Sequence, residues 1–230
     1  MKILAVADIH GDLKKLYTLI NNLKEKPDIV VVAGDLTPFG TKDLVPKIKS
    51  ALDKTAPYVF MIPGNEDPKD VRKEMDKLKI DMHNKSKKIG DTTLVGFEGE
   101  RWLEEGNQVF GVYDPVHKIL KKIKGKTILI SHVPPFETKA DILWTGRHVG
   151  SPFLKSLVED YQPDLVICGH IHESRCVDKV GKTKIVNTGA LSEGYAAWID
   201  TKNLDVSFFK IKRKKIEKIK NSIKKEEEIQ

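Results

Sequence analysis

Residues 3–12 read ILAVADIHGD, and this stretch decides the fold class. Its five leading apolar residues predict a buried strand, and the polar residues Asp8 and His10 follow where that strand ends. Asp12 then stands at the expected N-cap of a helix over residues 12–24. The order of strand, polar turn and helix is typical of an α/β fold.

The same order recurs along the first two thirds of the chain. Short apolar runs predict further strands over residues 28–33, 58–62, 92–97, 127–131 and 164–168. Amphipathic stretches predict helices over residues 42–52, 68–79, 114–124 and 151–161. Short strands alone are expected afterwards, over residues 175–180, 183–187, 195–200 and 205–210, and we interpret these as an antiparallel meander. We therefore predict one α/β domain over residues 1–210.

The positive charge is concentrated at the C-terminus. The formal net charge is +7, and residues 210–230 hold nine basic and four acidic residues, so the remaining chain is nearly neutral. This distribution argues against a nucleic-acid surface on the folded body. Residues 211–230 form a basic tail, which we expect to be helical or frayed because its isoleucines have an imperfect helical spacing.

The chain has no sequence signal for export or membrane insertion. It has only two cysteines, no signal peptide and no apolar stretch of membrane length. We therefore expect a soluble cytoplasmic protein without membrane contact. Its sequence leaves the oligomeric state open.

Polar residues follow five of the predicted strands. These residues are Asp8 and His10, Asp35, Asn65, His132, and His170 with His172. The carboxyl ends of strands in an open α/β sheet face a common crevice, so we expect these side chains to converge. Each short motif is weak by itself, since Gly-Asp and Gly-Asn are ordinary turn dipeptides. The ordered set is what predicts a metal site.

The predicted ligands indicate both the kind and the number of metal ions. Carboxylate, amide and imidazole groups together suit Mn²⁺ best, with Fe, Zn²⁺, Co²⁺ or Ni²⁺ as alternatives, whereas Mg²⁺ prefers oxygen and water. Seven ligands are too many for one ion, so we predict two divalent ions sharing a carboxylate. Such a pair lowers the pKa of a bridging water and stabilises displacement at phosphorus.

At this point the sequence resembles the calcineurin-like metallophosphoesterase superfamily, in particular its compact prokaryotic branch. The pattern of that superfamily is D-x-H, G-D, G-N-H-[ED], H and G-H-x-H, and the resemblance spans residues 2–187. It implies a four-layer αββα sandwich, with two mixed β-sheets flanked by helices. It also implies that one metal is held by Asp8, His10 and His172, the other by Asn65, His132 and His170, and that Asp35 bridges them.

One position departs from that pattern. Glu66 stands where the superfamily has a histidine that contacts phosphate and protonates the leaving group. Glu66 either replaces that acid, with a pKa raised by neighbouring anions, or turns away to cap a turn or the next helix. Without a general acid, the enzyme would depend on good leaving groups such as aryl esters.

The loop over residues 133–150 offers other catalytic candidates, because long loops in compact domains are often functional. Arg147 is suited to bidentate phosphate contact, and His148 to proton donation. Trp144 either stacks on an aromatic substrate group or anchors the loop.

The preferred function is hydrolysis of a phosphate ester, with a phosphodiester or nucleotide-type small molecule as substrate. A nuclease that binds nucleic acid through the basic tail is one alternative. A non-catalytic scaffold of the same fold is another, although all seven predicted metal ligands are present.

Overall fold

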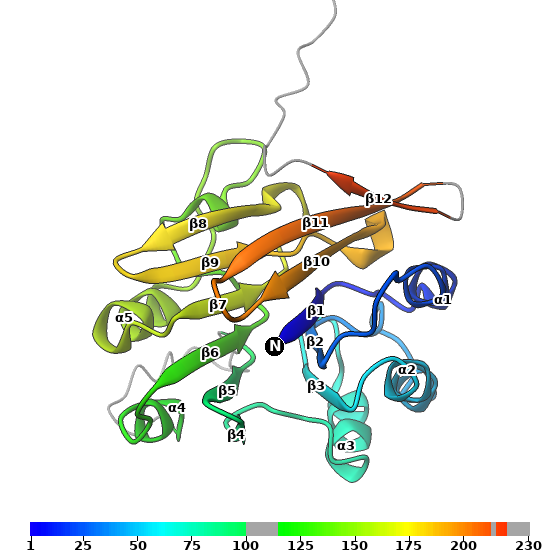
Figure 1. Cartoon of the computed structure of the whole chain (residues 1–230), viewed down its shortest axis with the longest axis horizontal. Coiled ribbons are helices and arrows are strands. Elements are labelled where there is room, and N and C mark those ends of the chain that lie inside the picture. The colour runs from blue at the N-terminus through cyan, green and yellow to red at the C-terminus, as the bar shows by residue number, and fades with distance from the viewer. Residues whose placement is uncertain (100–114, 213–214, 220–230) are drawn as a thin grey trace, which may run out of the picture.

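The computed structural model describes residues 1–99, 115–212 and 215–219, which form two six-stranded sheets. The first sheet has the order β12-β11-β10-β1-β2-β3 (Figure 1). Its strands are β1 (Lys2–Val6), β2 (Ile29–Ala33), β3 (Tyr58–Ile62), β10 (Tyr195–Asp200), β11 (Asp205–Lys212) and β12 (Lys215–Ile219). β1, β2 and β3 pair in parallel, and β10, β11 and β12 extend the sheet antiparallel beyond β1, so the sheet is mixed.

The second sheet has the order β4-β5-β6-β7-β9-β8 and is also mixed. Its strands are β4 (Ser86–Ile89), β5 (Thr92–Phe97), β6 (Lys126–Ser131), β7 (Leu165–Cys168), β8 (Cys176–Val180) and β9 (Thr183–Asn187). β5, β6, β7 and β9 run parallel, and the outer strands β4 and β8 are antiparallel.

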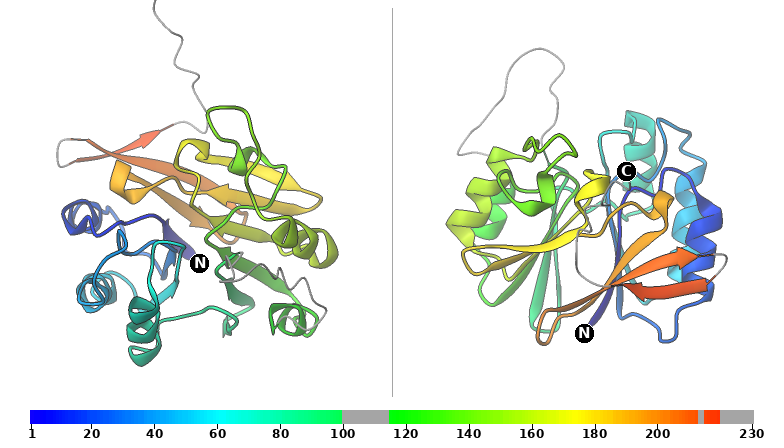
Figure 2. Two further views of the ribbon diagram at one scale, coloured as in Figure 1. Left: turned by 180° about the vertical axis from the view of Figure 1, so that it is seen from behind. Right: turned by 90° about the horizontal axis from the view of Figure 1, so that it is seen from above.

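Helices cover the outer face of each sheet (Figure 2, right). The first sheet is covered by α1 (Leu13–Asn21), α2 (Leu44–Asp53) and α3 (Lys69–Lys77), and the second by α4 (Pro115–Leu120) and α5 (Pro152–Tyr161). Three short 3₁₀ helices lie in loops: η1 (Lys139–Asp141), η2 (His172–Ser174) and η3 (Leu191–Glu193). The predicted four-layer αββα sandwich is confirmed.

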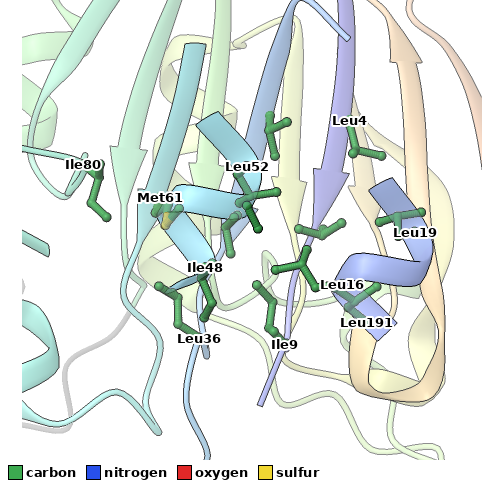
Figure 3. Close-up of a cluster of buried hydrophobic side chains, with 14 of the residues drawn as sticks. Leu4, Ile9, Leu16, Leu19, Leu36, Ile48, Leu52, Met61, Ile80 and Leu191 are labelled. Atoms are coloured by element: carbon green, nitrogen blue, oxygen red, sulfur yellow. The ribbon is translucent and has the colours of Figure 1, made fainter. Parts of the chain in front are cut away.

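Successive side chains of a strand point to opposite faces of its sheet, so a separate apolar core forms between each two adjacent layers of the sandwich. In β1, Leu4 and Val6 face the helices, whereas Ile3 and Ala5 face the second sheet. Figure 3 shows the cluster under the helices, where Leu16 of α1 packs close to the β1 strand. Each such buried leucine contributes about 1.5–3 kcal/mol relative to an exposed one.

The predicted strands and helices of the first two thirds are present within a few residues of their expected bounds. The Asp12 side chain accepts a hydrogen bond from the backbone nitrogen of Lys15 (2.9 Å), which confirms it as the N-cap of α1. Ser151 caps α5 in the same way through Leu154 (3.0 Å). None of the helices described is long and apolar enough to cross a membrane.

Two predictions for the last third are wrong. The strands there do not form one meander, because β8 and β9 join the second sheet whereas β10 and β11 join the first. Residues 215–219 are not helical or frayed but form β12, which pairs with β11 and places Ile216 opposite Ile211. The open edge of β11 offers backbone partners and an apolar surface, which outweigh the weak helical spacing. Residues 220–230 of the predicted tail lie outside the described residues.

Candidate metal centre

The seven predicted ligands lie where strands of the two sheets end. Those that follow strands of the first sheet are Asp8, His10, Asp35 and Asn65, and those that follow strands of the second are His132, His170 and His172. Asp8, Asp35 and His132 are 0, 3 and 1% exposed, while Asn65 is exposed to solvent. The cluster is therefore deeply buried at its carboxylates and accessible at Asn65.

Local packing fixes the first strand end. Ile9 is fully buried and points into the core beneath the helices (Figure 3). Asp8 and His10, on either side of it, have φ values of 53° and 44°. Asp35 and His170 also have positive φ, at 49° and 69°. Non-glycine residues adopt this conformation at a cost of about 1–3 kcal/mol each, and such residues are concentrated at functional sites.

Two glycines permit the close approach of the strand ends. A Cβ at Gly64 would overlap the carboxylate and the backbone nitrogen of Asp35. A Cβ at Gly169 would lie 2.5 Å from Asp8 Oδ2. The backbone nitrogen of His170 instead donates a hydrogen bond to that oxygen (3.0 Å), which links β7 to β1. These glycines are therefore required for the carboxylates to reach their positions.

The first group of potential ligands consists of Asp8, His10 and His172. The two imidazole Nε2 atoms are 3.3 Å apart, and His172 Nε2 is 3.6 Å from Asp8 Oδ1. Asp8 Oδ1 is buried, and among the described residues it has no hydrogen-bond partner. Two ring nitrogens and a carboxylate oxygen thus converge on one point.

A glutamate lies behind each of these imidazoles. Glu66 Oε2 is 3.0 Å from His10 Nδ1, and Glu193 Oε1 is 3.3 Å from His172 Nδ1. When each Nδ1 donates its proton to the glutamate, both Nε2 atoms keep a lone pair directed towards Asp8. Three electron-rich atoms so arranged repel one another unless a cation lies between them, so this group fits a divalent metal ion.

The second group is centred on His132, whose ring is fully enclosed. Its Nδ1 donates to the Ala33 carbonyl (2.9 Å), a bond that joins the two sheets. Its Nε2 lies 2.8 Å from Asn65 Oδ1 and 3.4 Å from Asp35 Oδ2. The His170 ring packs against the His132 ring with centroids 4.9 Å apart. An imidazole nitrogen and two acceptor oxygens again converge.

The pKa values of the histidines show that the second group favours positive charge. Burial alone would lower the pKa of His132, but its hydrogen bond to Asp35 and the charges of Asp35 and Asp8 raise that pKa to about 9. Burial, reinforced by the charge on His132, lowers the pKa of His170 to about 4. The surroundings therefore stabilise one cation at His132 and keep His170 neutral, the form that binds metals.

Three sets of residues each offer donor atoms that lie within 4.8 Å of one another. They are Asp8 with His10 and His172, Asp8 with Asp35 and His132, and His10 with Asp35 and Glu66. No such set among the described residues includes His170, although its ring lies against His132. The residue groups thus fit a divalent metal centre.

The suggestion that Glu66 turns away to cap a turn or helix is wrong. That role belongs to Asp67, which is buried and accepts hydrogen bonds from the backbone nitrogens of Leu36 (3.0 Å), Thr37 (2.9 Å) and Gly64 (3.0 Å). The Glu66 side chain instead contacts His10. Sequence reasoning missed Asp67 and Glu193, although Asp67 occupies the acidic position of the third motif.

The loop over residues 133–150 is organised by Asp141, a carboxylate that is 0% exposed. His148 Nδ1 donates to Asp141 Oδ1 (2.7 Å), while Arg147 is exposed. Trp144 is 87% exposed, so its indole does not anchor the loop.

Asn187 ties this loop to the predicted ligands. Its side-chain nitrogen donates to the carbonyls of Ala140 (3.1 Å) and Ile171 (2.9 Å). The loop therefore lies against the segment that carries His170 and His172. The glycine-flanked Arg147 and His148 stand out in the sequence, whereas the buried Asp141 that orients His148 carries no such signal.

Comparisons with known proteins identify the family. The calcineurin-like phosphoesterase family matches residues 1–174. The uncharacterised protein MJ1162 of Methanocaldococcus jannaschii is 34% identical over 220 residues, which cover 90% of this chain and 95% of that protein. A probable glycerophosphodiester phosphodiesterase, GpdQ, of Arcobacter nitrofigilis is 26% identical over 174 residues, which cover 72% of this chain and 64% of that protein.

The crystal structure of TT1561 from Thermus thermophilus shares the fold, with a TM-score of 0.72 at 18% identity, over 91% of this chain and 98% of that one. The match to the family covers most of the chain, and the clustered donor groups agree with it. The protein belongs to the calcineurin-like phosphoesterase family and is a metal-dependent hydrolase of phosphate esters.

Proposed function

We propose that the protein uses two divalent metal ions to hydrolyse a small phosphodiester or nucleotide-type substrate. Asp8, His10 and His172 would hold one ion, and Asn65, His132 and His170 the other, with Asp35 between them. The observation that carries this proposal is the convergence of the buried Asp8 Oδ1 with the Nε2 atoms of His10 and His172.

When bound, two such ions polarise the phosphate and lower the pKa of the attacking water. The residues of the chain supply what the ions need. Asp8 and Asp35 place two negative charges where little water can screen them, and His132 is held by a carbonyl from the other sheet. The mixed oxygen and nitrogen donors favour Mn²⁺, with Fe, Zn²⁺, Co²⁺ or Ni²⁺ as alternatives.

We propose that His148 donates the proton to the leaving group. Glu66 is poorly suited to that role, because its carboxylate lies 3.0 Å from His10 Nδ1. His148 has its Nδ1 fixed by Asp141, so Nε2 would be the ring nitrogen that donates the proton. Arg147, its exposed neighbour in the sequence, would bind the phosphate.

A diester is the preferred substrate, which the relation to a probable glycerophosphodiester phosphodiesterase supports. We also place the enzyme in the cytoplasm, where its two unpaired, buried cysteines would remain reduced.

Hydrolysis of bis(4-nitrophenyl) phosphate tests the proposed metal chemistry. Metal-stripped protein should be inactive and should recover with Mn²⁺, whereas Asp35→Asn and His132→Ala should not recover. Asp178→Asn, whose carboxylate accepts a hydrogen bond from the Lys139 backbone nitrogen, serves as a folded control. Equal turnover in wild type and Asp35→Asn would contradict the two-metal assignment.

Leaving-group dependence tests His148. General acid catalysis contributes about 10²–10⁴-fold when the leaving group is poor. His148→Asn should therefore lose activity on alkyl esters by about that factor, while activity on 4-nitrophenyl esters changes little. An equal loss on both classes would instead indicate a binding role.

A further inference from the structure

The glutamates behind His10 and His172 come from different parts of the chain. Glu66 belongs to the loop after β3, and Glu193 ends η3, between β9 and β10. Glu66 Oε2 lies 3.0 Å from His10 Nδ1, and Glu193 Oε1 lies 3.3 Å from His172 Nδ1. In the first group, both imidazoles thus have a carboxylate next to Nδ1, the ring nitrogen that is not directed towards Asp8.

The second group has a different arrangement. His132 Nδ1 donates to the backbone carbonyl of Ala33, which carries no net charge. Both kinds of partner fix the tautomer that leaves Nε2 free for a metal. Only a carboxylate also increases the electron density on the imidazole and adds a negative charge near the ion.

We propose that Glu66 and Glu193 are positioning residues that orient His10 and His172 and strengthen binding of the ion held with Asp8. This inference rests on the function proposed above. It assigns a role to Glu66, which replaces the histidine of the superfamily pattern. Glu66 would act through His10 and would not donate a proton to the leaving group. Its side chain is 25% exposed against 49% for Glu193, so its charge is less screened and its effect is larger.

Metal binding without substrate tests this inference. Stoichiometry and affinity for Zn²⁺ are measured by chelator competition on the metal-stripped wild type and on Glu66→Gln and Glu193→Gln. Glutamine keeps the shape and removes the charge. Loss of such a partner typically weakens metal affinity about 10–100-fold. In Glu66→Gln, the affinity for one of the two ions should fall by about this factor. In Glu193→Gln, the affinity for the same ion should fall by less.

Glu173→Gln is the matched control, because Glu173 directly follows His172 and its carboxylate accepts only from the backbone nitrogen of Trp144 among the bonds described (3.2 Å). Its affinities should equal those of the wild type. Affinities in Glu66→Gln and Glu193→Gln that match this control would overturn the inference. Because Glu193 is half exposed, its variant is expected to fold even if Glu66→Gln does not.

Proton NMR of the Zn²⁺-loaded protein separates positioning from direct ligation. The Nδ1–H protons of His10 and His172 should give downfield resonances, each displaced in the variant that lacks its glutamate. Weaker binding with an unmoved His10 resonance would assign Glu66 to the ion itself and overturn the inference. A wild type that binds no metal would refute the proposed function instead, so the two failures are distinguishable.

Discussion

Replacing Asp141 with asparagine tests how much one buried carboxylate contributes to the loop over residues 133–150. Asp141 Oδ1 accepts from Thr138 N (2.9 Å) and His148 Nδ1 (2.7 Å). Oδ2 accepts from Glu137 N (3.1 Å) and Gly150 N (2.9 Å). Asparagine has the same shape but replaces one oxygen with an NH₂ group, so two of these four donors must face another donor.

The orientation of the amide decides the magnitude. With NH₂ towards Glu137 and Gly150, two backbone N–H groups lose their acceptors. With NH₂ towards Thr138 and His148, the imidazole accepts after a change of tautomer, and one N–H remains unpaired. The second orientation costs less, and one unpaired buried donor costs about 1–3 kcal/mol. A chain of this size loses about 2–4 °C in Tm per kcal/mol, so the expected decrease is roughly 2–12 °C.

Thermal unfolding followed by circular dichroism measures this decrease. Ala140, next to Asp141, is fully buried in the core beneath α5, so loosening this segment affects global stability. The control is Asp178→Asn, which removes the charge of a partly exposed carboxylate that accepts a hydrogen bond from the backbone nitrogen of Lys139 in the same loop. This variant should change the free energy of unfolding by less than about 0.5 kcal/mol. If Asp141→Asn were as stable as Asp178→Asn, the argument from buried donors would be refuted.

Three further predictions concern other residues. In metal-stripped protein the raised pKa of His132 contributes stability that is fully present below pH 6.5 and is lost as pH rises through about 9. The free energy of unfolding measured with urea should therefore decrease over that window in the wild type, and decrease less in His132→Gln. Gly64→Ala should lose Mn²⁺-dependent activity and about 1–3 kcal/mol of stability, because its Cβ overlaps Asp35. Gly40→Ala is the control, because a Cβ there has no neighbour nearer than 3.3 Å. Burial raises the pKa of Cys168 and brings that of Cys176 to about 12, so a thiol reagent at about pH 8 should label neither in the folded protein and both in denaturant.

The sequence contains strong signals for the strands and for the residues at their ends. Apolar runs mark the buried strands, and Asp12 and Ser151 mark helix starts because a cap acts within three residues of itself. Asp8 and Asp35 could be expected to meet because they follow neighbouring parallel strands, whose carboxyl ends share one edge of the sheet. These inferences need only local periodicity and one rule of topology.

The supporting carboxylates could not be predicted in this way. His172 contacts Glu193 across two strands and a turn, and Asp141 reaches His148 within an irregular loop. Such pairs depend on how loops fold back in three dimensions, which no periodicity encodes. The same limit applies to β10, which sequence pattern identifies as a strand without indicating which sheet it joins.

The proposed ligands come from both sheets, so metal binding would affect the lifetime of the protein in the cell. An ion held by Asp8 and His172, or by Asp35 and His132, would connect the two halves of the sandwich. A ligand present at 100 times its Kd stabilises the folded state by about 2.7 kcal/mol, which lowers the unfolded population about a hundredfold. Proteases act on that population, so metal scarcity would increase turnover of the protein and its abundance would follow the supply of the metal.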